Sequence, residues 1–195
     1  MSGAPVRPSP LRGVLLLARG RGEGIACFRN SPEGFLGSLA PLLALPLAGA
    51  ALLVVRGAFM PAVALVLLAV ATQVAPPVLS HAVARALGRE DGWLRYATAY
   101  NWCQWANVAV MAVLLLVLSA VTGAPVRAVV GSPVFGYAVL GYSMWLHWVL
   151  ARSGLGLSRW RATGLVLAVS FGTMLLVVGP EVAGMLLEAP RAAGG

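Results

Sequence analysis

The chain has 195 residues, of which 59% are hydrophobic and only 10% are charged. An ordinary soluble domain, in which about 25% of residues are charged, is therefore excluded, because its surface would expose large apolar patches. The formal net charge of +8 comes from arginines, and the sequence contains no lysine. These arginines are spread over the connections between apolar runs, so they favour anionic lipid headgroups as a partner and disfavour nucleic acid.

Five uncharged runs divide the sequence, and each is long enough to cross a bilayer as a helix, which needs about 20 apolar residues. The runs are Gly34–Val55, Gly57–Ala84, Tyr96–Val126, Ala128–Ala151 and Ala162–Pro180. We therefore expect an all-α polytopic integral membrane protein with five transmembrane helices. The expected organisation is a basic cytoplasmic segment over residues 1–30, a transmembrane domain over residues 31–188 and a short external tail over residues 189–195.

The arginines also predict the orientation of these helices. Most of them lie in the N-terminal segment and in the connections after the second and fourth runs, whereas Arg56, Arg127 and Arg191 lie on the other side. By the positive-inside rule, the N-terminus is cytoplasmic and the C-terminus lies outside. The tryptophans favour the same orientation, because they lie in the cytoplasmic halves of the last three runs or beside them. The expected location is a bacterial cytoplasmic (inner) membrane.

The N-terminal segment carries a short apolar piece with flanking arginines, Leu11–Arg19. Two interpretations stay open, a helix lying flat in the inner interface of the membrane and a disordered tail. The stretch Gly20–Gly24 is glycine-rich without a helix-opening pattern after it, so it is interpreted as a flexible linker. Cys27 and Cys103 predict neither a disulfide framework nor a metal site.

The second run contains the consecutive prolines Pro76 and Pro77, which predict a helix break. Their missing N–H groups leave the carbonyls of Thr72 and Gln73 without helical partners. In hydrocarbon those carbonyls need another donor. One interpretation is a broken helix that lines a cavity or acts as a hinge, with the Gln73 amide beside it. The other, which we favour, is a kink satisfied by packing inside the bundle.

The third run begins with the densest polar group of the chain. Tyr100, Asn101, Gln104 and Asn107 fall within an arc of about 120° on a helix. Such a face should turn towards other helices, not towards lipid. Together with Gln73, the residues Asn101, Gln104 and Asn107 form a candidate intramembrane polar pocket between the second and third transmembrane helices. Hydrogen bonds that fix helix packing are the favoured alternative, because no ionisable residue joins the group.

The last two runs contain one histidine and one repeated pattern of small residues. His147 lies among tryptophans near the cytoplasmic end of the fourth run and is interpreted as an interface residue in preference to a proton relay. Gly164, Ala168 and Gly172 recur every four residues in the fifth run and form a helix-packing ridge. We expect this ridge to serve packing inside the protein, although a contact between two copies would give the same pattern.

The sequence offers no support for catalysis. It contains no visible pairing of a nucleophile with a base, no phosphate-binding loop after a strand and no zinc motif. We therefore expect a protein that is not an enzyme and that has no catalytic residues, cofactor or metal site.

Three features of the chain occur together. The first is the set of five spans with a cytoplasmic N-terminus. The second is the start of the third run, Gly88–Asn107, in which Arg95-Tyr96 follows a polar turn. The third is the stretch from Trp148 through Gly156-Leu157-Ser158 to Arg161-Ala162. In these features the chain resembles the bacterial branch of the Yip family, five-span membrane proteins of the Ypt/Rab-GTPase-interacting type. The resemblance covers most of residues 28–188. It implies the five-helix fold and a role in membrane organisation, and it carries over no functional residue.

The first hypothesis is accordingly a non-enzymatic membrane scaffold or assembly protein. Its partners would be the lipid bilayer with its anionic headgroups and a membrane protein or a second copy of the chain. The alternative is a small transporter or channel-like protein that uses the polar pocket between its second and third helices.

Overall fold

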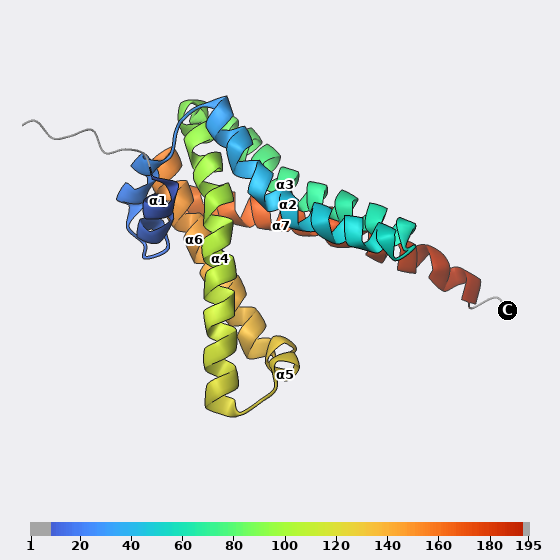
Figure 1. Cartoon of the computed structure of the whole chain (residues 1–195). Helices are drawn as coiled ribbons and strands as arrows, with labels where there is room; N and C mark the ends of the chain where they lie inside the picture. Colours follow the sequence, from blue (N-terminus) through green and yellow to red (C-terminus); the bar gives the residue numbers. More distant parts are fainter. Residues whose placement is uncertain (1–8, 193–195) are drawn as a thin grey trace, which may run out of the picture. The chain divides into compact units, whose positions relative to one another are not determined.

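The computed structural model of the chain describes residues 9–192, with side chains up to Gly179, and every regular element in this part is helical. In chain order the elements are α1 (Pro10–Leu17), the 3₁₀ helix η1 (Gly22–Cys27), α2 (Pro32–Val55), α3 (Phe59–Ala86), the 3₁₀ helix η2 (Glu90–Gly92), α4 (Trp93–Thr122), α5 (Val126–Val130), α6 (Pro133–Leu155) and α7 (Arg159–Ala192) (Figure 1). The predicted external tail, residues 189–195, lies outside the residues whose side chains are described.

Five helices in the described part of the chain are long and apolar enough to cross a membrane. They are α2, α3, α4 together with η2, α6, and residues 159–179 of α7. The chain is therefore an all-α polytopic integral membrane protein, and the prediction of five membrane-spanning helices is confirmed. The physical basis is simple, since only a helix satisfies all its backbone hydrogen bonds within one segment in hydrocarbon.

One boundary differs from the prediction. The fourth uncharged run was expected to span from Ala128, but α6 begins at Pro133 and the residues before it form the short helix α5. The Ser132 hydroxyl accepts a hydrogen bond of 3.3 Å from the N–H of Phe135, and Pro133 occupies the first helical position. A serine cap followed by proline is a strong helix start, so it separates α6 from α5.

The helices form two compact units, which are described separately. The first unit comprises residues 1–38 and 89–166, and the second comprises residues 39–88 and 167–195. Helix α2 begins in the first unit and continues into the second, and so does α7.

In the first unit, α4 and α6 lie against one another and α5 connects them (Figure 1). The core lies where α4 begins and α6 ends, and Tyr96, Leu146 and Leu150 are each only 1% exposed there. Towards α5 the helices expose apolar side chains, with Leu116 and Val134 both 67% exposed. In a bilayer such side chains meet lipid tails that are as apolar as they are.

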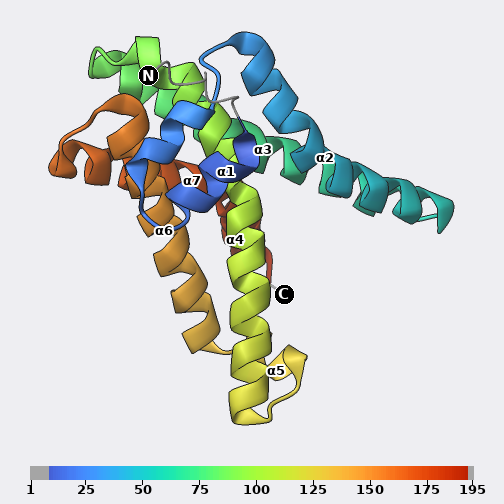
Figure 2. The same ribbon diagram turned by 60° about the vertical axis from the view of Figure 1, so that its left-hand side comes forward.

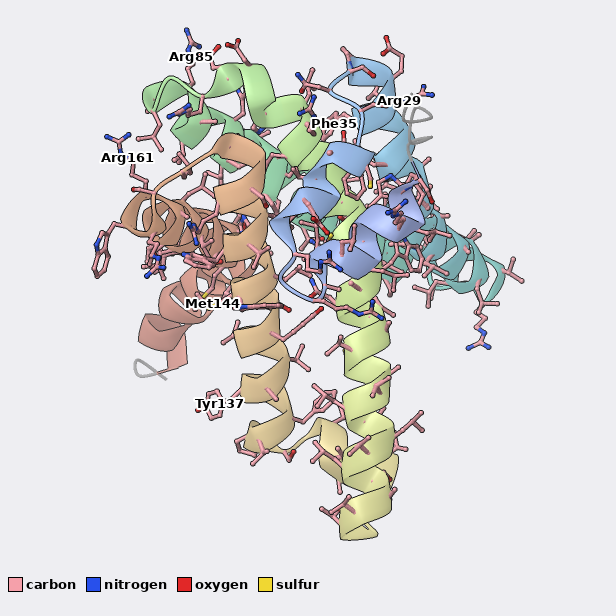
Figure 3. The ribbon with its side chains drawn as sticks, turned by 90° about the vertical axis from the view of Figure 1, so that its left-hand side faces the viewer. Arg29, Phe35, Arg85, Tyr137, Met144 and Arg161 are labelled. Atoms are coloured by element: carbon pink, nitrogen blue, oxygen red, sulfur yellow. The ribbon has the colours of Figure 1, made fainter. Side chains whose placement is uncertain are left out.

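The charged and apolar ends of α6 are visible in Figure 3. Arg29 and Arg161 lie at the end of the first unit where α4 begins and α6 finishes. Met144 and Tyr137 follow along α6 towards α5, and Tyr137 is 75% exposed. This distribution suits a helix with one end among headgroups and the other in or across the bilayer.

Helix α1 and η1 fold into a hairpin, here called the N-terminal hairpin, which packs against α4 and α6 (Figure 2). Leu17 is fully buried within it. A Cβ at Gly13 would lie 2.6 Å from the ring of Phe28, and a Cβ at Gly24 would lie 2.7 Å from the carbonyl oxygen of Gly13. Neither space admits a side chain, so both glycines are needed for the close packing of the hairpin.

The order of this hairpin corrects two expectations. The stretch Gly20–Gly24 is a turn followed by the start of η1, so the prediction of a flexible linker is wrong. The disordered-tail interpretation is also wrong for Pro10–Leu17, which form α1. Leu11 and Leu15 remain exposed on the outer side of α1. Contact between this side and the membrane interface stays a prediction.

The second unit packs through small residues. A Cβ at Gly49 of α2 would lie 3.4 Å from Leu65 of α3, and a Cβ at Gly172 of α7 would lie 2.7 Å from Cδ1 of Leu79. Helices α2 and α3 are joined by a tight turn at Gly57, whose φ of 78° lies in the left-handed region that favours glycine.

Candidate functional site

Three amide side chains lie along α4, and Asn101 is the most deeply buried of them. It is 1% exposed, and its Nδ2 donates a hydrogen bond of 2.8 Å to Oγ of Ser38 on α2, which is also 1% exposed. The Ser38 hydroxyl donates in turn to the backbone carbonyl of Phe35 at 2.6 Å. The amide therefore joins α4 to the first turns of α2, through a chain of hydrogen bonds buried in the first unit.

Gln104 and Asn107 lie further along the same helix and are half-buried. Nδ2 of Asn107 donates a hydrogen bond of 3.2 Å to Oε1 of Gln104, so the two amides pair within α4. The structure thus places Asn101, Gln104 and Asn107 along one helix, as predicted from their spacing. We call these three residues the amide patch.

Two oxygens of the amide patch are buried without a hydrogen bond from any described residue. They are Oδ1 of Asn101 and Oδ1 of Asn107. A buried acceptor left without a donor costs about 1–3 kcal/mol. These two oxygens are therefore the groups of the patch that are best suited to accept a hydrogen bond from water or from a small polar ligand.

A second buried polar group links α4 to α6. The Tyr96 hydroxyl and Nε2 of His147 share a hydrogen bond of 2.5 Å, and the ring centroids of Tyr100 and His147 lie 4.9 Å apart. His147 is 6% exposed and is therefore buried in the first unit, while its level relative to the membrane interface stays a prediction. It is a packing residue between two helices, held by two tyrosines one helical turn apart.

The helices can approach so closely at this group because of two glycines. A Cβ at Gly154 of α6 would lie 2.9 Å from Cβ of Tyr96, and a Cβ at Gly92 would lie 2.9 Å from the Gly154 carbonyl oxygen. The start of α4 and the end of α6 therefore cross almost backbone to backbone. This close crossing holds Tyr96 in place. The position of Tyr96 in turn sets the distance between its hydroxyl and Nε2 of His147.

Sequence reasoning missed Ser38, Tyr96 and Gly154. Ser38 is a single hydroxyl in an apolar run, and Gly154 has no side chain that could signal a contact. Tyr96 and Tyr100, four residues apart, were the available signal that α4 presents an aromatic face before its amide patch. Their partner on α6 is 51 positions from Tyr96, so local spacing could not identify it.

The predicted helix break and Gln73 lie in the second unit. Helix α3 continues as one helix from Phe59 to Ala86 through Pro76 and Pro77, so the chain does not break there. Both prolines are buried and Gln73 is half-buried. Gln73 and the amide patch belong to different units, and a pocket shared by them therefore stays a prediction.

The predicted packing ridge on α7 is used unevenly in the structure. Gly164 and Ala168 are exposed, and a Cβ at Gly164 would meet no atom within 4 Å. Gly172 is half-buried and approaches Leu79, as described above. Within the first unit, Gly164 is therefore open to another helix, whereas Ala168 and Gly172 belong to the second unit.

Among the residues whose side chains are described, no three of His, Cys, Asp and Glu are grouped as a metal ion would require. The buried polar groups of the first unit are instead neutral amides, hydroxyls and an imidazole, which form hydrogen bonds between helices. No family model, no curated protein and no solved structure matches this chain.

Proposed function

We propose that this integral membrane protein is a non-enzymatic scaffold or membrane-organisation protein of a bacterial cytoplasmic membrane, with its N-terminus in the cytoplasm. The observation that carries the proposal is the use of buried polar side chains for contacts between helices. Asn101 reaches Ser38 of α2, and Tyr96 reaches His147 of α6. Hydrogen bonds of this kind contribute about 0.6–2 kcal/mol each to helix association in membranes, and they specify which helices pair.

The open part of the ridge on α7 supplies a surface for a partner. Gly164 lets another helix approach closely, and no described side chain of its own unit covers it. The apolar side chains around it, such as Leu167, which is 54% exposed, suit a transmembrane helix of another membrane protein. A scaffold of this kind would hold its partner through shape, because lipid tails remove most of the hydrophobic driving force.

The orientation and the family resemblance support the same proposal. Arginines are concentrated in the segments expected on the cytoplasmic side, which favours a cytoplasmic N-terminus. The features shared with the Yip family imply a role in membrane organisation. The cytoplasmic N-terminus and the role in membrane organisation are parts of this proposal that rest on the sequence.

The test is purification of the tagged full chain from its native membrane in mild detergent, with co-purifying proteins identified and quantified. We expect a stoichiometric membrane-protein partner that is lost with Gly164→Leu. The matched control is Gly136→Leu on α6, because a Cβ at Gly136 also meets no atom within 4 Å. Both substitutions replace a poor helix former by a good one, so neither should unfold its helix.

Three results would contradict this proposal. A partner retained by Gly164→Leu would remove the ridge from the interface. Loss of the partner from both variants would indicate a general effect of leucine. A clean oligomer of this chain alone, dissociated by Gly164→Leu, would assign the ridge to a second copy and not to a different protein.

A small transporter or channel-like protein is the second candidate, and the two unpartnered amide oxygens of Asn101 and Asn107 favour it. Replacement of Asn101, Gln104 and Asn107 together by leucine distinguishes the two functions. A transporter should lose ligand-dependent thermal stabilisation or flux in the triple variant. A scaffold should keep its partner in the variant, provided that the variant still folds.

A further inference from the structure

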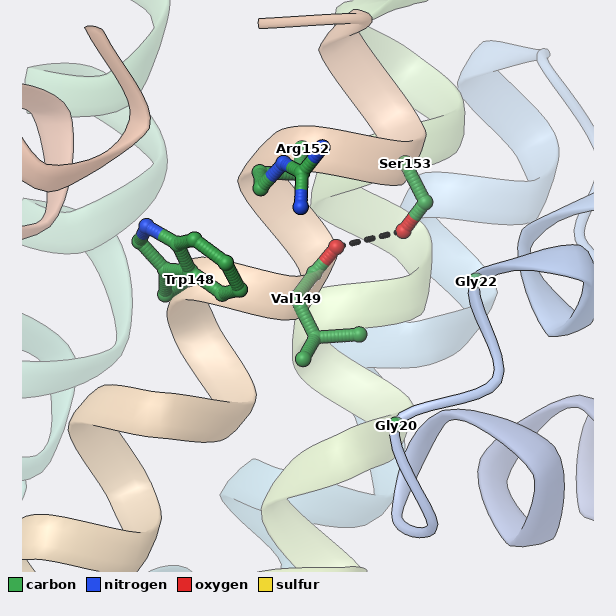
Figure 4. A pocket seen from close by; sticks show the side chains of 6 residues that line it. All are labelled: Gly20, Gly22, Trp148, Val149, Arg152 and Ser153. Carbon is green, nitrogen blue, oxygen red and sulfur yellow. Dashed lines mark hydrogen bonds between the residues drawn. The ribbon is translucent and has the colours of Figure 1, made fainter. Parts of the chain in front are cut away.

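A cavity of about 260 Å³ lies between the N-terminal hairpin and α6. It is lined by Gly20, Gly22, Trp148, Val149, Arg152 and Ser153 (Figure 4). Gly20 has a φ of 78°, which turns the chain sharply at the tip of the hairpin. A Cβ at Gly22 would lie 3.0 Å from Cβ of Ser153. The turn therefore comes close to α6 and still leaves a hollow.

Among the residues that the structure describes, Arg152 is the one charged side chain that lines the cavity. Its guanidinium carbon lies 4.9 Å from the centre of the Trp148 ring, one turn earlier on α6 (Figure 4). Stacking on an indole holds the guanidinium plane in place and leaves its N–H edge free for a ligand. Among the described side chains, no carboxylate pairs with Arg152.

The nearest acidic residue in the hairpin sequence is already paired. The Glu23 carboxylate lies 2.5 Å from the guanidinium of Arg21, and both side chains are about 60% exposed to solvent. This pair is neutral as a whole, so it does not cancel the charge of Arg152. Trp148 also points its Nε1 at the carbonyl of Arg159, at 3.4 Å, which places the start of α7 beside the cavity. The contact from α7 at the cavity is a backbone carbonyl, and the charge on the cavity wall comes from Arg152.

The position of the cavity along α6 indicates what kind of anion reaches it. Arg152 and Trp148 lie in the last two turns of this membrane-spanning helix, which ends at Leu155. Tryptophan and arginine at such a position normally lie at the level of the lipid headgroups. A planar guanidinium is suited to bind two oxygens of a phosphate at once.

We propose that this cavity binds the phosphate of an anionic phospholipid headgroup, with Arg152 as the residue that contacts the phosphate and Trp148 as the residue that orients it. The inference goes beyond the proposed function and holds whether the helices recruit a partner or line a transport path. The same chemistry would also accept a soluble phosphate monoester, so the experiment separates the two sources.

The experiment uses native mass spectrometry of the purified full chain in a non-ionic detergent. The protein is titrated with short-chain phosphatidylglycerol, with short-chain phosphatidylcholine and with glycerol 3-phosphate. We expect phosphatidylglycerol to bind most tightly. Arg152→Gln should weaken its binding about tenfold, because charged hydrogen bonds to the phosphate are lost. Arg152→Lys keeps the charge without the planar stacking and should give a smaller loss.

The matched control is Arg161→Gln, which removes an equal charge from an exposed arginine of α7 that does not line the cavity. Its effect should be clearly smaller than that of Arg152→Gln. Equal losses in both variants would mean diffuse attraction between charges and would overturn the site. Binding of phosphatidylglycerol that is insensitive to Arg152→Gln and Arg152→Lys would overturn it as well. Glycerol 3-phosphate binding as tightly, with the same dependence on Arg152, would keep the phosphate site and overturn its assignment to a lipid.

Discussion

The described contacts on which this comparison rests differ between the two units of this protein. In the first unit, Asn101 and Ser38 bond across 63 positions of sequence, and Tyr96 and His147 bond across 51. In the second unit the Thr72 hydroxyl bonds to carbonyls of its own helix, and the approach of α7 to α3 depends on Gly172 against the tip of Leu79. Directional bonds and a backbone crossing tolerate little change, whereas contact with a flexible side chain can adjust.

The first way to test this difference is to place a methyl-bearing side chain at the crossing of α4 and α6. Gly154→Val should lower the free energy of unfolding by about 3 kcal/mol, because its Cβ would meet Cβ and Cα of Tyr96, neither of which can move aside. Reversible denaturation in detergent measures the change. Gly136→Val, on the same helix in open space, is the control and should cost far less. Equal effects would show that the crossing is looser than its distances indicate.

The next test removes the hydroxyl of Tyr96. Tyr96→Phe leaves the imidazole of His147 buried without its hydrogen-bond partner, and this should cost about 2 kcal/mol of stability. Tyr137→Phe makes the same chemical change at a side chain that is 75% exposed, so it should be nearly neutral. Thermal unfolding of both variants in the same detergent makes the comparison, and similar melting temperatures would argue against a structural role for the Tyr96 hydroxyl.

A double-mutant cycle then isolates the bond between α4 and α2. Asn101→Ala and Ser38→Ala should each be destabilising, and the coupling energy between them should be about 1 kcal/mol. Losses that simply add would mean that the two side chains do not interact in the membrane-embedded protein. The same cycle bears on the alternative function, because an Asn101 side chain used for a ligand would lose binding in excess of its loss of stability.

The smallest effect is expected in the second unit. Gly172→Ala places a Cβ 2.7 Å from Cδ1 of Leu79, and that methyl group can rotate away. The net cost should be about 0.5 kcal/mol, because better helix propensity offsets much of the strain. Gly179→Ala is the control in open space. A loss comparable to that of Gly154→Val would contradict the distinction between the two units.

Local sequence patterns predicted much of the fold and part of the candidate site. Uncharged runs marked the five membrane-spanning helices, and the spacing of Asn101, Gln104 and Asn107 placed them along one helix. The same kind of reasoning failed for the N-terminal hairpin. A glycine such as Gly24 suggests flexibility when read alone, but in the folded chain a Cβ at this position would lie 2.7 Å from the backbone carbonyl oxygen of Gly13.

The sequence by itself therefore determined that the chain is a helical membrane protein. In the hydrocarbon core of a bilayer, every charge and every unpaired backbone group is unfavourable, so the membrane-spanning segments must be long uncharged runs that form helices. Only the tertiary structure decided which polar side chains meet. Tyr96 with His147 and Asn101 with Ser38 are partners chosen by helix packing, and so is the hollow beside Arg152. Packing depends on the shapes of segments far apart in the chain, so it cannot be predicted from the residue spacing within one helix.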